Sequence, residues 1–475
     1  MIDLTQTNAR EVARRVNAGE WKAVEVARSA LGRIEVHDDR LRAFITVTAE
    51  QALADAEAVD RAVEAGRSFP MAGVPLAVKD GFWTEGVRTT NGSNALLDFV
   101  PGADAEAVAR LRKAGCLLVG KTLMHEYAYG FTSQNPHFGD ARNPWDPSRV
   151  PGGSTGGGAV ALAAGMALAA VGGDTGGSVR QPSALCGVVG LKVTYGRVSR
   201  HGGIPLSWSM DTVGPMARTA EDAALMLSVM AGADPKDPAT LPAPALPDPI
   251  AADGSGDLRG LRIGVPTGFF FDLAGPEVAA SVRDAVEVVR GLGATIVEVP
   301  FPGPELARAA HRAIIFAEAA AAHESTARTP ANGLSDEVRN LLLAGLFLTG
   351  KQYLDGQRVR RVVIDQYREL WRSFDVLATP TSPIVATPIG EQEAEAAGQK
   401  RPLVQLYLDH TLPFNLTGQP ALSVPCGFSS SGLPIGLQLV GRPWDEATLL
   451  RVGAAYQAAT HWTDRVPPGL DGAGS

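Results

Sequence analysis

Cysteine is scarce in this 475-residue chain, which contains only Cys116, Cys186 and Cys426. The three thiols are far apart and lie in apolar surroundings, which excludes a disulfide framework and a cysteine metal knuckle. Free thiols fit a reducing compartment, and the polar start of the chain shows no basic-then-apolar leader. The sequence therefore predicts a cytoplasmic protein.

Metal-binding patterns are also missing, because none of the eight histidines belongs to an H-E-x-x-H or comparable pair. His201, His311, His323 and His410 lie in no local setting that marks a catalytic base. We therefore expect neither a metal nor a cofactor.

An excess of positive charge is absent as well: 43 Lys and Arg face 51 Asp and Glu, a net charge of −8. Nucleic-acid binding through a basic surface needs clustered Lys and Arg, and no such cluster occurs. One uncharged run, from Gly156 to Gly173, reaches the lower length limit of a membrane span. It consists mainly of Ala and Gly, so we interpret it as a buried helix followed by a strand, and expect neither a nucleic-acid nor a membrane partner.

Short apolar strands alternate with helices along most of the chain, which favours an α/β fold with a sheet covered on both faces. We expect one domain, 1–475, divided into a helical N-terminal segment (1–70), a core (71–231), a Pro-rich surface connector (232–257) and a second α/β part (258–475). Strands are expected at 72–78, 116–119, 167–171, 262–265, 295–299, 376–378, 421–424 and 436–440, and helices at 104–114, around 159, at 276–292, within 304–373 and at 446–459.

Two motif matches fail on their context. Gly115 to Thr122 fits the phosphate-binding pattern G-x-x-x-x-G-K-[ST]. A phosphate-binding loop comes after a strand, however, and here the interior residues of the pattern are themselves the expected strand. Gly152 to Gly156 fits the nucleophile elbow G-x-S-x-G, but three prolines interrupt 143–151 and prevent the strand that an elbow must follow.

Glycine is abundant, with 53 residues, and ten of them fall within the 27 residues from Gly152 to Ser178. Residues without Cβ allow close approach of the backbone to a ligand and positive φ, as a backbone oxyanion hole requires. Tight strand-to-helix turns in a crowded sheet explain the same glycines equally well, so glycine content alone leaves both interpretations open.

Further motifs resemble the amidase signature family over nearly the whole chain. They are Ala72-Gly-Val-Pro-Leu-Ala-Val-Lys79-Asp80, the Gly-Gly-Ser segments ending at Ser154 and Ser178, the runs 181–192, 195–199 and 211–215, and later 380–383 and 413–418. The resemblance implies the amidase signature fold, an α/β fold with a central mixed sheet covered on both faces by helices.

The resemblance also implies the chemistry. Ser178 is the expected nucleophile, Ser154 a bridging serine after a cis peptide bond, and Lys79 the base. A lysine accepts a proton only when neutral, and at its ordinary pKa only about one in a thousand is neutral near pH 7.4, so burial must lower the pKa of Lys79. The remaining expected residues are the oxyanion-hole N–H groups of Thr175, Gly176, Gly177 and Ser178, and the bracing pair Asp174 and Arg180.

The implied reaction is hydrolysis of a small-molecule amide through an acyl-Ser178 intermediate, with esters and carbamates as further substrates. Aromatic residues near 126–131 suggest a pocket formed by Ala128, Tyr129 and Phe131, with further walls from 206–210 and the helices of 309–352. The alternative is a glutaminase-like component of a tRNA-dependent amidotransferase, which supplies ammonia to a partner subunit. For the stand-alone hydrolase, a homodimer is a candidate assembly.

Overall fold

The computed structural model describes residues 2–246 and 256–470. Within them, eleven strands form one mixed sheet in the order β1-β3-β2-β4-β6-β5-β12-β13-β9-β7-β8, and β10 and β11 form a separate two-stranded sheet. The strands are β1 (Phe44–Val47), β2 (Pro75–Lys79), β3 (Leu117–Thr122), β4 (Ala169–Asp174), β5 (Val189–Lys192), β6 (Thr212–Ala217), β7 (Arg262–Thr267), β8 (Thr295–Pro300), β9 (Val376–Pro380), β10 (Glu393–Ala396), β11 (Gln399–Pro402), β12 (Ala421–Phe428) and β13 (Pro434–Gly441).

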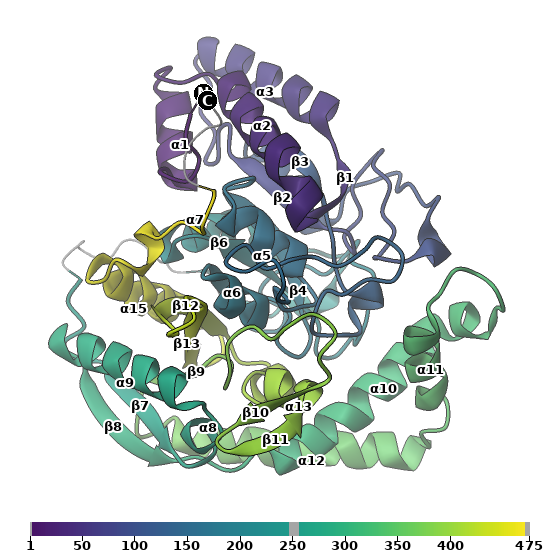
Figure 1. Ribbon diagram of the computed structural model, residues 1–475, viewed down its shortest axis with the longest axis vertical. Coiled ribbons are helices and arrows are strands. Elements are labelled where there is room, and N and C mark those ends of the chain that lie inside the picture. Colours follow the sequence, from purple (N-terminus) through teal and green to yellow (C-terminus); the bar gives the residue numbers. More distant parts are fainter. Residues whose placement is uncertain (1, 247–255, 471–475) are drawn as a thin grey trace.

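Helices flank this sheet (Figure 1), which confirms the predicted α/β class. In Figure 1, α10, α11 and α12 extend away from the sheet, and α10 packs against both of the others. The helices are α1 (Ala9–Asn17), α2 (Ala23–Leu41), α3 (Ala49–Glu64), α4 (Glu106–Lys113), α5 (Gly156–Ala163), α6 (Arg180–Cys186), α7 (Ala220–Met230), α8 (Phe269–Asp272), α9 (Pro276–Gly291), α10 (Glu305–Arg328), α11 (Asp336–Gly345), α12 (Gly350–Leu370), α13 (Leu403–Leu408), α14 (Leu412–Leu416) and α15 (Glu446–Ala458).

The centre of the sheet places three strand ends side by side. β2 runs parallel to β4, and β4 runs antiparallel to β6 with Asp174 opposite Thr212. Lys79 ends β2, Asp174 ends β4 and Thr212 begins β6, so all three lie at the same edge. All residues of β2 and β6 are buried, which explains their nearly continuous apolar sequences.

Most predicted elements of the second half are found within a few residues of their expected bounds. The connector, predicted at 232–257, contains a short 3-10 helix (Pro238–Thr240), and its residues 247–255 lie outside the described part of the chain. Strands from both sides of the connector belong to the same sheet, because β5 pairs with β12.

Several short strands were not predicted. β1, β5 and β6 contain only four to six residues, and Pro215 interrupts the pattern of β6. β10 and β11 carry charged sequences that do not resemble a buried strand. Sheet neighbours rather than local preference determine these elements.

The glycine-rich window is more regular than a single ligand-binding loop. Gly156–Gly158 form the first turn of α5, and Gly172 and Gly173 belong to β4. A Cβ on Gly157 would lie 2.3 Å from the Ala43 carbonyl oxygen and 2.5 Å from that of Leu123. Close packing of the backbone in a crowded sheet therefore explains this glycine.

Candidate active site

A lysine–serine hydrogen bond lies at the carboxyl end of β2. Lys79 Nζ donates to Ser154 Oγ over 2.8 Å, and both side chains are buried. Burial lowers the pKa of Lys79 to about 7, although the nearby carboxylates of Asp211 and Asp174 act in the opposite direction. At neutral pH a substantial fraction of this lysine is therefore uncharged and can accept a proton.

Ser154 is held by the backbone around it. The Gly153–Ser154 peptide bond is cis. Gly153 N–H donates to Gln181 Oε1 over 2.8 Å, and His125 N–H donates to the Ser154 carbonyl over 3.2 Å. These hydrogen bonds anchor the backbone on both sides of the Ser154 side chain.

Ser178 lies in the turn between β4 and α6 and is 8 % exposed. Its carbonyl accepts a hydrogen bond from Thr155 N–H, the residue after Ser154, over 3.3 Å. The structure therefore brings Lys79, Ser154 and the Ser178 turn together, although Lys79 and Ser178 lie 99 positions apart in the sequence.

The backbone N–H groups expected to form the oxyanion hole fall into two groups: among the described residues, that of Gly177 is hydrogen-bonded within the protein, and the other three are not. Gly177 N–H donates to Asp174 Oδ1 over 2.8 Å, so it is engaged within the protein, and its role in an oxyanion hole stays a prediction. In the described structure, the N–H groups of Thr175, Gly176 and Ser178 make no hydrogen bond. Gly177 has φ +138, and a Cβ there would lie 2.3 Å from Thr411 Oγ1, so its requirement for glycine is conformational and steric.

Asp174 and Arg180 brace the turn. Two guanidinium nitrogens of Arg180 each donate to Asp174 over 3.0 Å, and both side chains are fully buried. Burial alone would raise the pKa of Asp174, but the attraction of Arg180 outweighs it and holds this pKa well below the usual range. Arg180 also donates to Thr411, Asn415 and Gln438, which lie beyond the connector.

His311 of α10 contacts the same turn, which sequence reasoning missed. Its Nε2 lies 3.1 Å from the Thr175 carbonyl oxygen. Burial lowers the pKa of His311 to about 4, so at neutral pH the ring is uncharged and Nε2–H donates to the carbonyl. No local motif surrounds this histidine, and only the fold brings it to residue 175.

A cavity of about 180 Å³ opens at this edge of the sheet and includes Lys79, Asp174 and Thr175 in its walls. Of the predicted pocket residues, Ala128 lines the cavity. Tyr129 instead packs on Phe316, with ring centroids 5.8 Å apart, and Phe131 packs on Tyr407 at 5.9 Å. Both aromatic residues pack in hydrophobic clusters and do not line this cavity, so their part in substrate binding stays a prediction. The remaining walls are Gly81, Phe82, Asn91, Met124, Gly173, Arg200, Gly203, Ile204, Pro205, Leu206, Trp208, Asp211, Thr212 and Val213.

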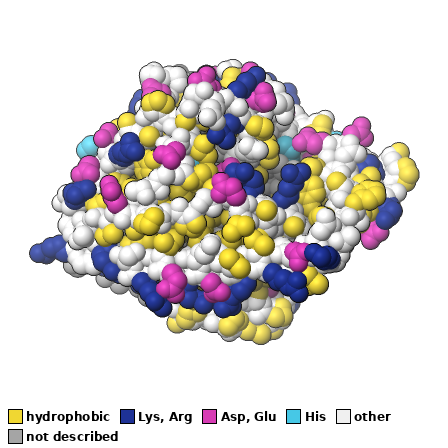
Figure 2. All heavy atoms as spheres, turned by 90° about the horizontal axis from the view of Figure 1, so that it is seen from below, with side chains coloured by type: hydrophobic (Ala, Val, Ile, Leu, Met, Phe, Trp, Pro, Cys, Tyr) yellow, Lys and Arg dark blue, Asp and Glu magenta, His cyan; other side chains and the backbone are white. Residues whose placement is uncertain are grey.

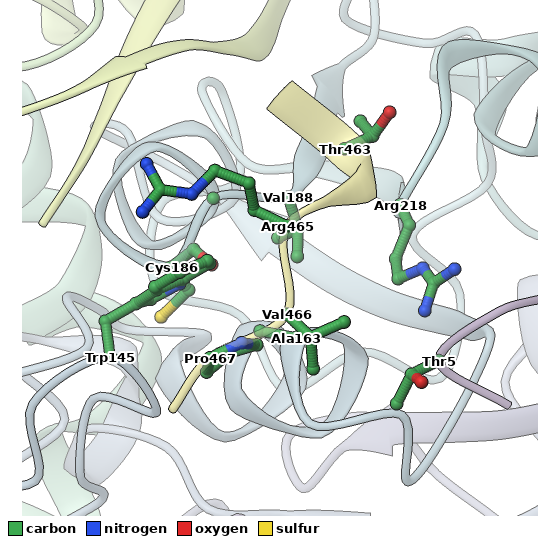
Figure 3. A pocket seen from close by; sticks show the side chains of 11 residues that line it. Thr5, Trp145, Ala163, Cys186, Val188, Arg218, Thr463, Arg465, Val466 and Pro467 are labelled. Atoms are coloured by element: carbon green, nitrogen blue, oxygen red, sulfur yellow. The ribbon is translucent and has the colours of Figure 1, made fainter. Parts of the chain in front are cut away.

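A second cavity, about 20 Å³, lies elsewhere and carries no comparable chemistry. Figure 3 shows Trp145, Cys186, Arg218 and Arg465 among the residues around it. Burial raises the pKa of the Cys186 thiol far above its ordinary value, which makes it a poor nucleophile. Among the described residues, no three His, Cys, Asp or Glu side chains are grouped as metal ligands.

Two properties bear on membrane and charged partners: the length of the apolar helices and the distribution of charge on the surface. No helix in the described ranges has an apolar stretch sufficient to cross a membrane. On the face shown in Figure 2, acidic and basic side chains lie beside one another over much of the surface.

A mixed sheet that presents a buried lysine bonded to a serine, beneath a turn that carries a second serine, is typical of an enzyme that uses an activated nucleophile. A family model described as Amidase matches residues 25–450, and the chain belongs to the amidase family, whose members act on amide carbon–nitrogen bonds.

Its relatives include both kinds of enzyme considered above. The chain is 45 % identical to the A component of the glutamyl-tRNA(Gln) amidotransferase of Roseiflexus sp. (strain RS-1), over 98 % of each chain. A solved structure of an amidase is 36 % identical, covers 95 % of this chain and 99 % of its own, and superposes with a TM-score of 0.86. A bacterial aryl acylamidase of the amidase signature enzymes is 27 % identical, with 98 % of each chain covered and a TM-score of 0.89.

Proposed function

We propose that this enzyme is a stand-alone amidase in which Ser178 is the nucleophile, Ser154 relays a proton and Lys79 is the base. The observation that carries the proposal is the 2.8 Å hydrogen bond from buried Lys79 to Ser154, combined with a lysine pKa of about 7. A buried lysine without a directly bonded carboxylate is suited to accept a proton, whereas a solvated lysine stays charged.

In the first half of the reaction, Ser178 Oγ attacks the amide carbonyl carbon. Its proton passes to Ser154 Oγ as the proton of Ser154 passes to Lys79 Nζ. The N–H groups of Thr175, Gly176 and Ser178 receive the negative charge that develops on the carbonyl oxygen. The carbon–nitrogen bond then breaks, and the amine leaves with the proton returned by Lys79 through Ser154.

In the second half, water attacks the acyl-Ser178 ester and gives its proton to the same serine–lysine pair. The acid is released as Ser178 recovers its proton. The proposal requires neither a metal nor a cofactor. The three free, buried cysteines support a cytoplasmic location.

The test compares Ser178→Ala, Ser154→Ala and Lys79→Ala with the parent enzyme on a panel of aliphatic, aryl and carbamate substrates. Intact-protein mass spectrometry should detect an acyl adduct on the parent and none on Ser178→Ala. Hydrolysis should fall at least about 1000-fold in Ser178→Ala, as in other enzymes that lose their nucleophile. Normal turnover by Ser178→Ala would refute the assignment, as would activity that a chelator removes and zinc restores.

A second candidate is the ammonia-supplying component of an amidotransferase, and the specific observation in its favour is the 45 % identity to such a protein over almost the full length. The discriminating measurement is ammonia release from glutamine by the purified chain, alone and with candidate partner proteins. Glutaminase activity that appears only with a partner favours this second function, whereas hydrolysis of simple amides by the chain alone favours the first.

A further inference from the structure

Almost every polar side chain in the wall of the cavity that contains Lys79 is already engaged. Lys79 bonds to Ser154, Thr175 Oγ1 to Asp211, and Thr212 Oγ1 to the Asp174 carbonyl. Asp211 also accepts from the N–H groups of Leu206 and Ser207.

The single arginine in the wall is also neutralised. Arg200 Nε and Nη2 donate to the two carboxylate oxygens of Asp237, over 2.9 and 2.7 Å, and Nη1 donates to the Trp208 carbonyl. Asp174 is paired with Arg180. Asp211, in contrast, accepts hydrogen bonds only from neutral donors of Thr175, Leu206 and Ser207. The described wall residues therefore offer no unengaged cation, and an anionic substituent of a substrate would enter without a counter-charge.

Asn91 is the exception among the buried residues of the wall. It is 2 % exposed, yet its side-chain amide makes no hydrogen bond within the described structure. Both side-chain amide atoms of Asn91 keep some contact with solvent, because neither is among the fully buried polar atoms that lack a hydrogen bond. The amide therefore borders the cavity. Trp208 also lacks a hydrogen bond at its indole nitrogen, but it is 62 % exposed at the cavity mouth, where water is available.

The backbone holds Asn91 in place. Its N–H donates to the Asp80 carbonyl over 3.1 Å, and its carbonyl accepts from Tyr127 N–H over 2.9 Å. Its φ is +52, a left-handed conformation that asparagine tolerates better than most residues. Gly81 makes room for the amide, because a Cβ there would lie 2.9 Å from Asn91 Oδ1.

We infer that Asn91 determines specificity: its amide hydrogen-bonds the substrate group that fills this cavity, and that group is not anionic, is largely apolar and carries one hydrogen-bonding atom. Phe82, Met124, Ile204, Leu206 and Val213 supply the apolar surface around it. This inference rests on the proposed amidase function. It disfavours a free amino acid, whose carboxylate needs a counter-charge that the wall does not offer.

The test measures hydrolysis of benzamide and the three pyridinecarboxamides, which have nearly the same shape but place a ring nitrogen at different positions. The parent should prefer at least one pyridinecarboxamide to benzamide by about tenfold in kcat/KM, the worth of one good hydrogen bond. Asn91→Gly accepts the left-handed backbone and should abolish this preference mainly through KM. Gly81→Ala should reduce it too, because the new Cβ displaces the amide.

Ala397→Gly is the matched control, since Ala397 has φ +50 in the exposed turn between β10 and β11, and it should change neither constant. Thermal unfolding of all variants identifies any loss of folding. An unchanged preference in folded Asn91→Gly would overturn the inference, as would efficient cleavage of free glutamine by the chain alone. If the parent forms no acyl-Ser178 adduct with any amide, the proposed function fails and the inference fails with it.

Discussion

Arg180 and Asp174 form a fully buried ion pair with two hydrogen bonds of 3.0 Å across the base of the Ser178 turn. Asp174 also accepts a hydrogen bond from Gly177 N–H, so the pair controls the backbone next to the proposed nucleophile. Removal of the Arg180–Asp174 ion pair therefore affects both the stability of the fold and the geometry of the turn.

Arg180→Ala should lower the free energy of unfolding by about 3–5 kcal/mol, because it leaves Asp174 buried without a counter-charge. Denaturant titration measures this change. Lys351→Ala, which removes an exposed ion pair to Asp355, is the control and should leave the unfolding midpoint unchanged. Equal midpoints for Arg180→Ala and the parent would contradict the assigned bracing role.

Activity should depend on pH through Lys79. The base works only when uncharged, so kcat/KM should rise with pH through about 7 and then level off. The carboxylate of Asp211 raises the pKa of Lys79, so Asp211→Asn should move this rise to lower pH. The pH profile of a well-cleaved amide tests both statements, and a profile that is flat from about pH 5 to 9 would argue against Lys79 as the base.

His311→Ala should lower kcat about tenfold and change KM little, because the Thr175 carbonyl loses its donor and the oxyanion turn loses support. His311→Gln can supply another donor and should restore part of kcat. His311 acts as a positioning residue, so the pH profile above about 6 should keep its shape, since the pKa of this histidine lies at about 4. A shifted pH profile would instead indicate that His311 exchanges protons during the reaction.

Gly177→Ala should abolish activity, because the added Cβ would collide with Thr411 Oγ1 and the residue has φ +138. Gly432→Ala is a matched control at another positive φ, +77, where nothing lies within 4 Å of the added carbon. That variant should lose about 1–2 kcal/mol of stability and keep its kcat. Steady-state kinetics beside circular dichroism separates the two effects, and an active, folded Gly177→Ala would show that the turn tolerates a side chain.

The parts of the site that lie on continuous motifs were predictable from the sequence. Lys79 ends an apolar strand, and Ser154 and Ser178 follow paired glycines, so local pattern and family resemblance were sufficient to propose them as site residues. The structure adds the Lys79–Ser154 contact, which depends on how β2 packs beside α5 and β4. The order of strands in the sheet is likewise a property of the whole chain.

The cavity walls were not predictable in the same way. Tyr129 and Phe131 are close to the site in sequence but turn toward Phe316 and Tyr407. Asn91 and Arg200 line the cavity although they belong to separate irregular segments, and His311 arrives from a distant helix. Which side chains face a cavity between segments depends on tertiary packing, for which periodicity within one segment contains no signal.

The bonds that Arg180 makes with Thr411, Asn415 and Gln438 have a consequence for biosynthesis. They join residues 231 to 258 positions apart, so the turn around Ser178 acquires its full set of supports only after residue 438 has left the ribosome. A nascent chain that already contains Lys79, Ser154 and Ser178 therefore lacks these supports. Catalytic competence should arise late, when β13 joins the sheet, and a protein shortened before β13 should be inert even with every reactive residue present.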